Sequence, residues 1–262
     1  MGYCAQKIRR FLVKEVLFKN ERVEHFIRHG IVRHVKKIQN SFLKPPLYYF
    51  RNAPILRKLI EGRKVLIIGA GQSAAELGAI PGGVAVFTCN AGLGLLAERE
   101  FKGVVDLYYY HKRRDKWKTR GMEASVVKAR INVLVMNNLR HIKDETRLQN
   151  AYSKAIADYN RNNFYLKRLI KPYRANDLKA NDVTWSSAGM RLLQYALYFK
   201  AAEIYLIGID MTDGYYWGEE NARIQTQFDE NLMKVLSRKF HNIYTLSKDS
   251  AMANYVPYKP LD

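Results

Sequence analysis

A glycine turn between two apolar segments is the first stretch of this chain whose residues could do chemistry. The apolar segment 64–68 (KVLII) runs directly into GAGQS at 69–73. Glycines let backbone amides approach a phosphate closely, and the N-terminus of a following helix favours negative charge. The pattern predicts a strand and a phosphate-binding turn, although a tight turn without a ligand is the alternative, because one Gly-x-Gly is a weak signal. The candidate binding residues of the turn are Gly69, Gly71, Gln72 and Ser73.

The end of the next apolar segment bears on the type of ligand. Segment 84–90 (VAVFTCN) predicts a second strand that ends at Asn90. A Rossmann site for a dinucleotide has a third glycine in its turn and an acid that closes the second strand and holds the ribose hydroxyls. Ala74 and Asn90 occupy these two positions. The pattern therefore departs from that of a dinucleotide site.

A second set of candidates lies between residues 181 and 217. A serine pair precedes an apolar helix predicted for 190–199, and serines at such a place are usually caps that accept the first free N–H groups. Segment 203–208 predicts a buried strand whose carboxyl end presents an acid, and an aromatic loop follows it. An acid beside paired tyrosines at a strand end indicates a ligand mouth. The candidates are Ser186, Ser187, Gly208, Asp210, Tyr215 and Tyr216.

Alternating strands and helices must position these residues. Strands are predicted near residues 64, 84, 104, 131, 203 and 242, with helical segments between them. This alternation predicts one α/β domain with a doubly wound, mostly parallel, Rossmann-like sheet. Ligands of such sheets bind outside the carboxyl ends of the strands, where the candidates lie. The polar segment 144–174 has a helical pattern and is predicted to form a substrate-facing helical insertion.

The charge of the chain indicates an anionic partner. Against 24 Asp+Glu there are 44 Lys+Arg, and the net charge of +20 fits nucleic acid, acidic lipid or a phosphorylated substrate. A basic cluster, His111 and residues 112–114, follows the third predicted strand and is expected near the ligand; solvated surface is the alternative. The two cysteines indicate neither a disulfide framework nor a zinc site. No run of about 18 apolar residues exists, so we expect a cytoplasmic protein.

The N-terminal part is the most basic. Residues 1–50 contain eleven Lys+Arg and three Glu, and apolar residues recur at helical spacing within 7–43. Basic amphipathic helices of this kind lie on anionic membrane surfaces, but they also pack on their own domain with a solvated basic face. Pro45-Pro46 ends the pattern. We expect a basic helical appendage at 1–46 and an α/β domain at 47–262.

Five segments, in order, resemble motifs of the bacterial sialyltransferases of glycosyltransferase family 42. The resemblance covers about residues 64–255, and 203–210 is its most specific part. It implies a variant of the GT-A fold, a CMP-activated sugar as donor substrate, and no metal or other cofactor. The matching segments are Gly69-Ala70-Gly71-Gln72-Ser73 (family Gly-Asn-Gly-Pro-Ser), Thr88-Cys89-Asn90 (Arg-Cys-Asn), Ser186-Ser187-Ala188-Gly189 (Thr-Ser-Gly), EIYLIGID at 203–210 (Glu-Ile-Tyr-Leu-x-Gly-Ile-Asp) and DSAMAN at 249–254 (Asn-Ser-x-x-Ala-Asn).

The resemblance also implies roles for the candidates. The glycine turn with Ser73 would face the donor phosphate, Asn90 the nucleotide sugar or phosphate, and the Ser186-Ser187 pair, through Ser187, the donor carboxylate. Gly208 and Asp210 would face the cytidine. Tyr216, with Tyr215 beside it, would stabilise the departing phosphate, since phenol O–H groups stabilise developing negative charge.

The general base of the family has no counterpart here. The family's histidine would fall near Arg223, and no histidine lies between His141 and His241. His111 is our substitute, with Asp213 and Glu219 as rivals.

The implied reaction moves a 2-keto acid sugar, sialic acid or Kdo, from its CMP ester to a saccharide or lipid-linked glycan, in lipopolysaccharide or capsule synthesis. We expect the enzyme at the inner face of the membrane, and the sequence is compatible with a homo-oligomer. Two alternatives remain. GAGQSAAE also resembles the NADPH turn of flavin-dependent N-hydroxylating monooxygenases, although a flavin fingerprint is missing. A basic nucleic-acid-binding protein would fit the charge, although no motif of that class is present.

Overall fold

The computed structural model describes residues 45–110, 130–136, 152–157, 186–212, 214–218 and 226–262. The chain divides into two units, 1–51 and 52–262, and the second contains the sheet. Several sequence predictions lie outside the described residues: the basic helices at 7–43, His111, Asp213, Glu219 and Arg223.

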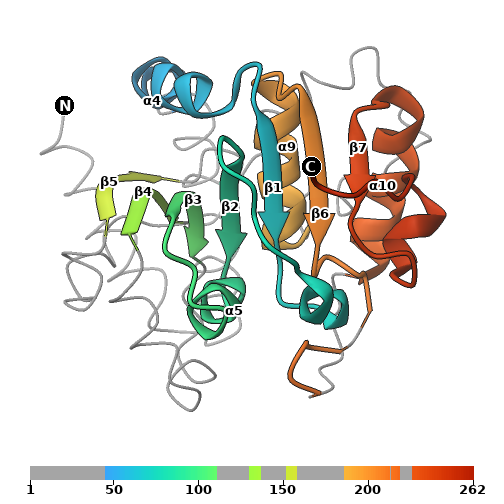
Figure 1. Ribbon diagram of the computed structural model, residues 1–262. Helices are drawn as coiled ribbons and strands as arrows, with labels where there is room; N and C mark the ends of the chain where they lie inside the picture. Colours follow the sequence, from blue (N-terminus) through green and yellow to red (C-terminus); the bar gives the residue numbers. More distant parts are fainter. Residues whose placement is uncertain (1–44, 111–129, 137–151, 158–185, 213, 219–225) are drawn as a thin grey trace, which may run out of the picture. The chain divides into compact units, whose positions relative to one another are not determined.

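Seven parallel strands form one sheet, in the order β5-β4-β3-β2-β1-β6-β7 (Figure 1). The six predicted strands are present, and the predicted α/β fold with a parallel, Rossmann-like sheet is confirmed. The strands are β1 (Lys64–Ile68), β2 (Ala85–Cys89), β3 (Val104–Tyr110), β4 (Arg130–Met136), β5 (Tyr152–Ala157), β6 (Glu203–Ile207) and β7 (Ile243–Thr245).

Strand β5 contradicts the helical pattern predicted for 144–174. It pairs in parallel with β4, from Tyr152 opposite Ile131 onward. Ser153 and Lys154 of β5 are exposed and Ile156 is buried. The sequence of β5 is therefore as polar as that of a surface segment. Pairing with a neighbour, and not local composition, makes this edge segment a strand.

Helices cover both faces of the sheet. Helix α9 packs on β1, β2 and β3, and α5 packs on β2. Helix α4 begins at the Pro45-Pro46 pair, which suits a first turn because proline lacks the N–H that a helix start leaves unpaired. The described helices are α4 (Pro45–Ile60), α5 (Gly92–Glu98), α9 (Ala188–Tyr198) and α10 (Thr226–Lys239), with 3₁₀ helices η2 (Gln72–Glu76) and η6 (Ala251–Asn254).

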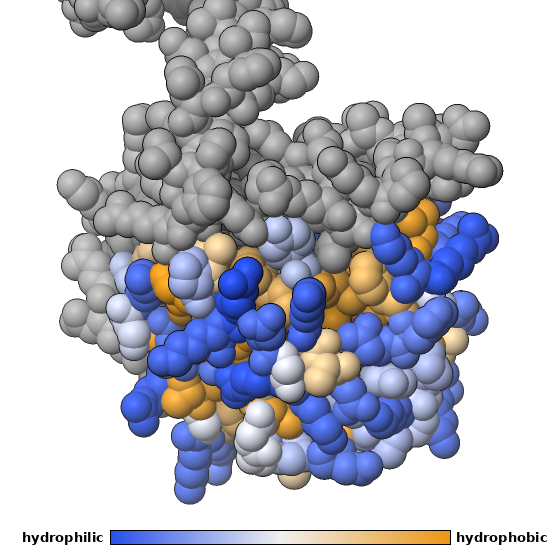
Figure 2. All heavy atoms as spheres, turned by 90° about the horizontal axis from the view of Figure 1, so that it is seen from above, coloured by the Kyte–Doolittle hydropathy of each residue, from blue (hydrophilic) through white to orange (hydrophobic). Residues whose placement is uncertain are grey.

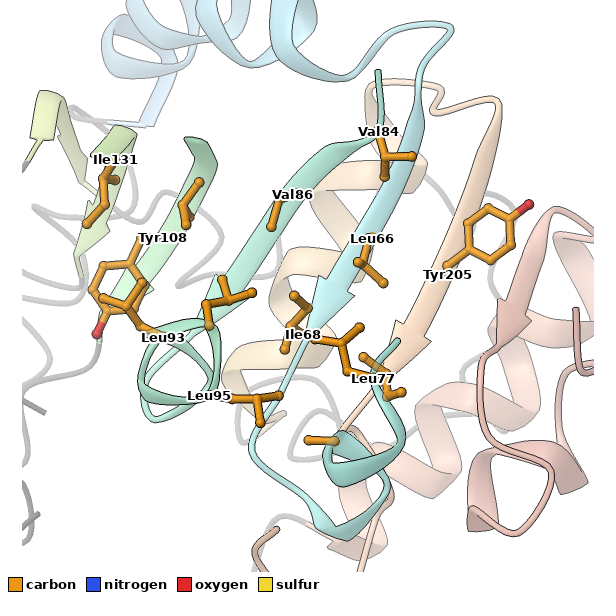
Figure 3. Close-up of a cluster of buried hydrophobic side chains, with 14 of the residues drawn as sticks. Leu66, Ile68, Leu77, Val84, Val86, Leu93, Leu95, Tyr108, Ile131 and Tyr205 are labelled. Atoms are coloured by element: carbon orange, nitrogen blue, oxygen red, sulfur yellow. The ribbon is translucent and has the colours of Figure 1, made fainter. Parts of the chain in front are cut away.

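The central strands β1, β2, β3 and β6 are buried on both faces, which explains their nearly continuous apolar sequences. Side chains alternate between the faces, so Leu66 and Ile68 of β1 point to one side and Val65 and Ile67 to the other. Figure 3 shows the first side, where Leu66 and Ile68 lie among Leu77, which directly follows η2, and Leu93 and Leu95 of α5. Each such fully buried side chain contributes about 1.5–3 kcal/mol to folding.

The order of the strands reverses beside β1. The chain runs from β1 through β2, β3 and β4 to β5 in one direction, and then returns to place β6 on the other side of β1. In open α/β sheets the ligand crevice lies at such a switch point, at the carboxyl ends of the strands. The fold therefore favours the ends of β1, β2 and β6 as the site.

Figure 2 shows the molecule from the amino ends of the strands, opposite the edge where the candidates lie. The residues that are not drawn in grey on this face are mostly hydrophilic. Within the part of the chain that the structure describes, no helix has the length and apolar character needed to cross a membrane.

Candidate functional site

The ends of β1 and β6 meet backbone to backbone. Gly69 N–H donates to the carbonyl of Ile207 and Gly71 N–H to that of Gly208, both at 2.8 Å. A Cβ at Gly69 would lie 2.0 Å from the Gly208 oxygen, and one at Gly71 would lie 2.5 Å from Oδ2 of Asp210. Gly208 has a φ of +67°, which favours glycine. The glycine pattern is thus explained by packing alone and does not require a ligand.

Ser73 and Asp210 lock this junction. The Asp210 carboxylate accepts hydrogen bonds from Ser73 N–H at 2.7 Å and from the Ser73 hydroxyl. The Ser73 oxygen in turn accepts the N–H of Gly208 at 2.8 Å. Both side chains are buried, at 6% and 3% exposed. The acid that the sequence placed at a strand end therefore holds the glycine turn in its conformation.

Asn90 follows β2 in the left-handed conformation, with a φ of 48°. Asparagine tolerates this region better than other non-glycine residues. Its N–H donates to the carbonyl of Tyr109 at 3.0 Å, and its own carbonyl accepts the Tyr108 hydroxyl at 3.3 Å. These bonds fix its backbone at the end of β2, next to the end of β1.

Ser187 caps the N-terminus of α9. Its Oγ accepts the N–H of Met190 at 3.3 Å, and its N–H donates to Oδ1 of Asp229 at 2.8 Å. Asp229 lies on α10 and is 4% exposed, and a buried carboxylate is stabilised by the positive end of a helix dipole. Ser186, the residue before Ser187, is buried as well.

The start of α9 lies at the same edge of the sheet as the glycine turn. A Cβ at Gly189 would lie 2.8 Å from the Ile209 side chain, just beyond β6. Arg191, on the same helix, donates to the Tyr109 hydroxyl at 3.3 Å and brings a cation to the end of β3.

The aromatic loop after β6 contacts the glycine turn. Tyr216 N–H donates to the carbonyl of Ala70 at 3.1 Å, and its hydroxyl donates to Oε1 of Glu98 at 3.0 Å. The Tyr215 ring stacks on Trp217, with centroids 4.3 Å apart. A Cβ at Gly214 would overlap the Gln72 side chain at 2.2 Å. The loop therefore lies against the turn at Ala70 and at Gln72.

The fifth motif lies at this edge too. It follows β7, where Ser250 caps η6 by accepting the N–H of Met252. Just before it, the Ser247 hydroxyl donates to Oε1 of Glu76 in η2 at 2.8 Å. The segment after β7 thus contacts the short helix that follows the glycine turn.

The structure gathers the described candidates at one edge and adds two acids that the sequence did not single out. Asp229 and Glu98 bond to Ser187 and Tyr216, from which they are separated by 42 and 118 positions in the sequence. No local pattern indicates either pairing. The candidates present at this edge are Gly69, Gly71, Gln72, Ser73, Asn90, Ser186, Ser187, Gly208, Asp210, Tyr215 and Tyr216.

Several titratable groups in the described part of the chain have shifted pKa values. The hydrogen bond from Lys259 lowers the pKa of Glu203, at the amino end of β6, and a bond from Tyr205 adds to the effect. Burial raises the pKa of Tyr205 and of Tyr255. Within the described part of the chain, no three His, Cys, Asp or Glu residues gather as metal ligands would. The edge can offer N–H groups, O–H groups and a guanidinium to an anion.

Comparison with known proteins gives matches only among solved structures. The chain matches no protein-family model and no curated protein. It is similar to the sialyltransferase CstII from Campylobacter jejuni in complex with cytidine-5'-monophosphate, with 17% identity, a TM-score of 0.48 and coverage of 77% of this chain and 87% of that one. For the same enzyme in complex with the substrate analogue CMP-3FNeuAc, the identity is 17%, the TM-score is 0.46, and the match covers 75% of this chain and 85% of that one. At this degree of similarity, the case for the function of this chain rests on its own residues.

Proposed function

We propose that this protein is a glycosyltransferase that uses a CMP-activated 2-keto acid sugar and needs no metal. One observation carries the proposal. Segments of all five motifs that resemble family 42, distant in sequence, lie at the carboxyl edge of a single parallel sheet around its switch point. A nucleotide is expected at this place in such a fold.

The chemistry of the edge fits a departing phosphate. In the transfer, an acceptor hydroxyl attacks the anomeric carbon, the bond from that carbon to the phosphate oxygen breaks, and CMP leaves with the electron pair. The Tyr216 hydroxyl is a donor that can meet the charge that develops on the phosphate. Arg191 adds positive charge nearby. The sequence has no Asp-x-Asp motif for a metal, and we assign the metal's electrostatic role to these groups.

Asp210 and Ser73 act mainly on the shape of the site. Their mutual hydrogen bonds hold the glycine turn, which would face the phosphate. The Asp210 oxygens keep further acceptor capacity, because each carboxylate oxygen has two lone pairs. Contact of Asp210 with the cytidine, and of Asn90 with the nucleotide, remains part of the proposal. The acceptor proton goes to a base for which His111 is our first candidate, before Asp213 and Glu219.

Sialic acid and Kdo are both suitable donor sugars, since their CMP esters present the same phosphate, anomeric carbon and carboxylate. The basic segment 7–43 would hold the enzyme on the inner membrane face, where lipid-linked acceptors of lipopolysaccharide or capsule synthesis are presented; each basic residue adds ~1 kcal/mol near an anionic surface. Full-length protein should then co-sediment with vesicles that contain acidic lipid and not with neutral ones. Equal sedimentation with both would remove the membrane role.

A thermal-shift screen separates the proposal from its two alternatives. A ligand that binds only the native state raises the unfolding temperature. We expect CMP to raise it, and NADPH and a single-stranded oligonucleotide to leave it unchanged. Stabilisation by NADPH or the oligonucleotide, without an effect of CMP, would replace the proposal by the corresponding alternative.

A further inference from the structure

Glu98 and Tyr216 join two parts of the site. Glu98 is the last residue of α5, which follows β2, and Tyr216 lies in the loop after β6. The Tyr216 hydroxyl donates to Glu98 at 3.0 Å, and the Tyr216 N–H donates to Ala70 in the glycine turn at 3.1 Å. One tyrosine therefore reaches from the turn after β1 to the helix after β2.

The hydroxyl of Tyr216 has one hydrogen to give. The proposed function requires this hydrogen for the donor phosphate. The carboxylate of Glu98 is also an anionic acceptor, and both acceptors form charge-assisted hydrogen bonds. The Tyr216 hydroxyl can therefore donate its hydrogen either to Glu98 or to the phosphate, but not fully to both.

We propose that Glu98 competes with the phosphate of CMP and of its sugar ester for the Tyr216 hydroxyl, and so weakens nucleotide binding. This inference rests on the proposed function. Weaker binding of CMP favours its release after transfer, when the product must leave. Glu98 is a positioning residue, because it acts on the nucleotide through Tyr216. Since its side chain is exposed, solvent screens the effect and keeps it small.

Calorimetric titration of the full-length protein with CMP tests the competition. Glu98→Gln removes the charge and keeps the size of the side chain, and we expect it to bind CMP about two- to fivefold more tightly. Glu100→Gln is the matched control, because it removes a negative charge from another exposed glutamate two residues away. We expect the affinity of this variant for CMP to equal that of the wild type. In a Tyr216→Phe background, Glu98→Gln should give no gain, since no hydroxyl is shared.

A gain in affinity is a readout that damage to the fold does not produce. Three results would overturn the competition: no gain with Glu98→Gln, the same gain with Glu100→Gln, or a gain that persists with Tyr216→Phe. If the wild-type protein binds CMP and Glu98→Gln matches it, only this inference fails. If the wild type does not bind CMP, the proposed function fails, and the competition for a CMP phosphate fails with it.

Discussion

The carboxylate of Asp210 accepts two hydrogen bonds from Ser73, one from the N–H at 2.7 Å and one from the hydroxyl. Asp210 lies in the segment after β6 and Ser73 in η2 after β1, and these two strands lie on either side of the switch point. The Ser73 oxygen also accepts the N–H of Gly208. The Ser73 side chain thus connects the glycine turn after β1 to Gly208 and Asp210 after β6.

Ser73→Ala is expected to destabilise the protein by about 1–3 kcal/mol, because it leaves the buried Gly208 N–H without the Ser73 oxygen as acceptor and removes the hydroxyl, one of the two Ser73 donors to Asp210. Chemical denaturation measures the change. Ser153→Ala, at an exposed position of β5, is the control and should stay within about 0.5 kcal/mol of wild type. An equally small effect at Ser73 would show that the junction does not depend on this side chain.

Gly71→Ala should both destabilise the protein and abolish CMP binding. The new Cβ would lie 2.5 Å from the Asp210 carboxylate, so the turn must shift, at a cost of about 1–3 kcal/mol. Gly78→Ala is the matched control, since a Cβ there meets nothing within 4 Å. Thermal unfolding with and without CMP checks both variants. Normal CMP binding by Gly71→Ala would place the nucleotide elsewhere.

Asn90 allows its backbone and side-chain roles to be separated. Residue 90 has a φ of 48°, a left-handed conformation that alanine adopts less readily than asparagine, and glycine adopts freely. Asn90→Ala should therefore cost about 1 kcal/mol of stability, whereas Asn90→Gly should cost little. Both should weaken CMP binding if the side chain contacts the nucleotide. Denaturation and calorimetry measure the two effects. If Asn90→Gly binds CMP as wild type does, Asn90 serves the backbone alone.

Acid stability should depend on Glu203. The hydrogen bond from Lys259 lowers the pKa of this carboxyl in the folded protein. A lowered pKa contributes stability that is present above the unfolded value, ~4.3, and is lost as the pH falls through the folded value. Glu203→Gln should therefore lower the unfolding temperature at pH 7 and narrow its difference from wild type below pH 4. A difference that is constant across this range would contradict the linkage.

Hydrophobic pattern predicted most of the fold because buried parallel strands are almost wholly apolar. The runs that became β1, β2 and β6 need no context to be recognised. β5 was missed because Ser153 and Lys154 are exposed, and only its pairing with β4 makes it a strand. Glycine and acid positions were found by their types, but their mutual packing was not. Gly71 and Asp210 pack against each other although 139 positions separate them in the sequence (210 − 71), and no local rule reports such a contact.

Release of CMP from an activated sugar tests the central claim most directly. The full-length protein is incubated with CMP-sialic acid or CMP-Kdo, with a saccharide acceptor, and with or without EDTA, and free CMP is measured over time. We expect release from one of the two donors at a rate that EDTA does not change, and a rate lower by up to about 10²–10³ with Tyr216→Phe. No release from either donor, or release that strictly requires a divalent metal, would contradict the account.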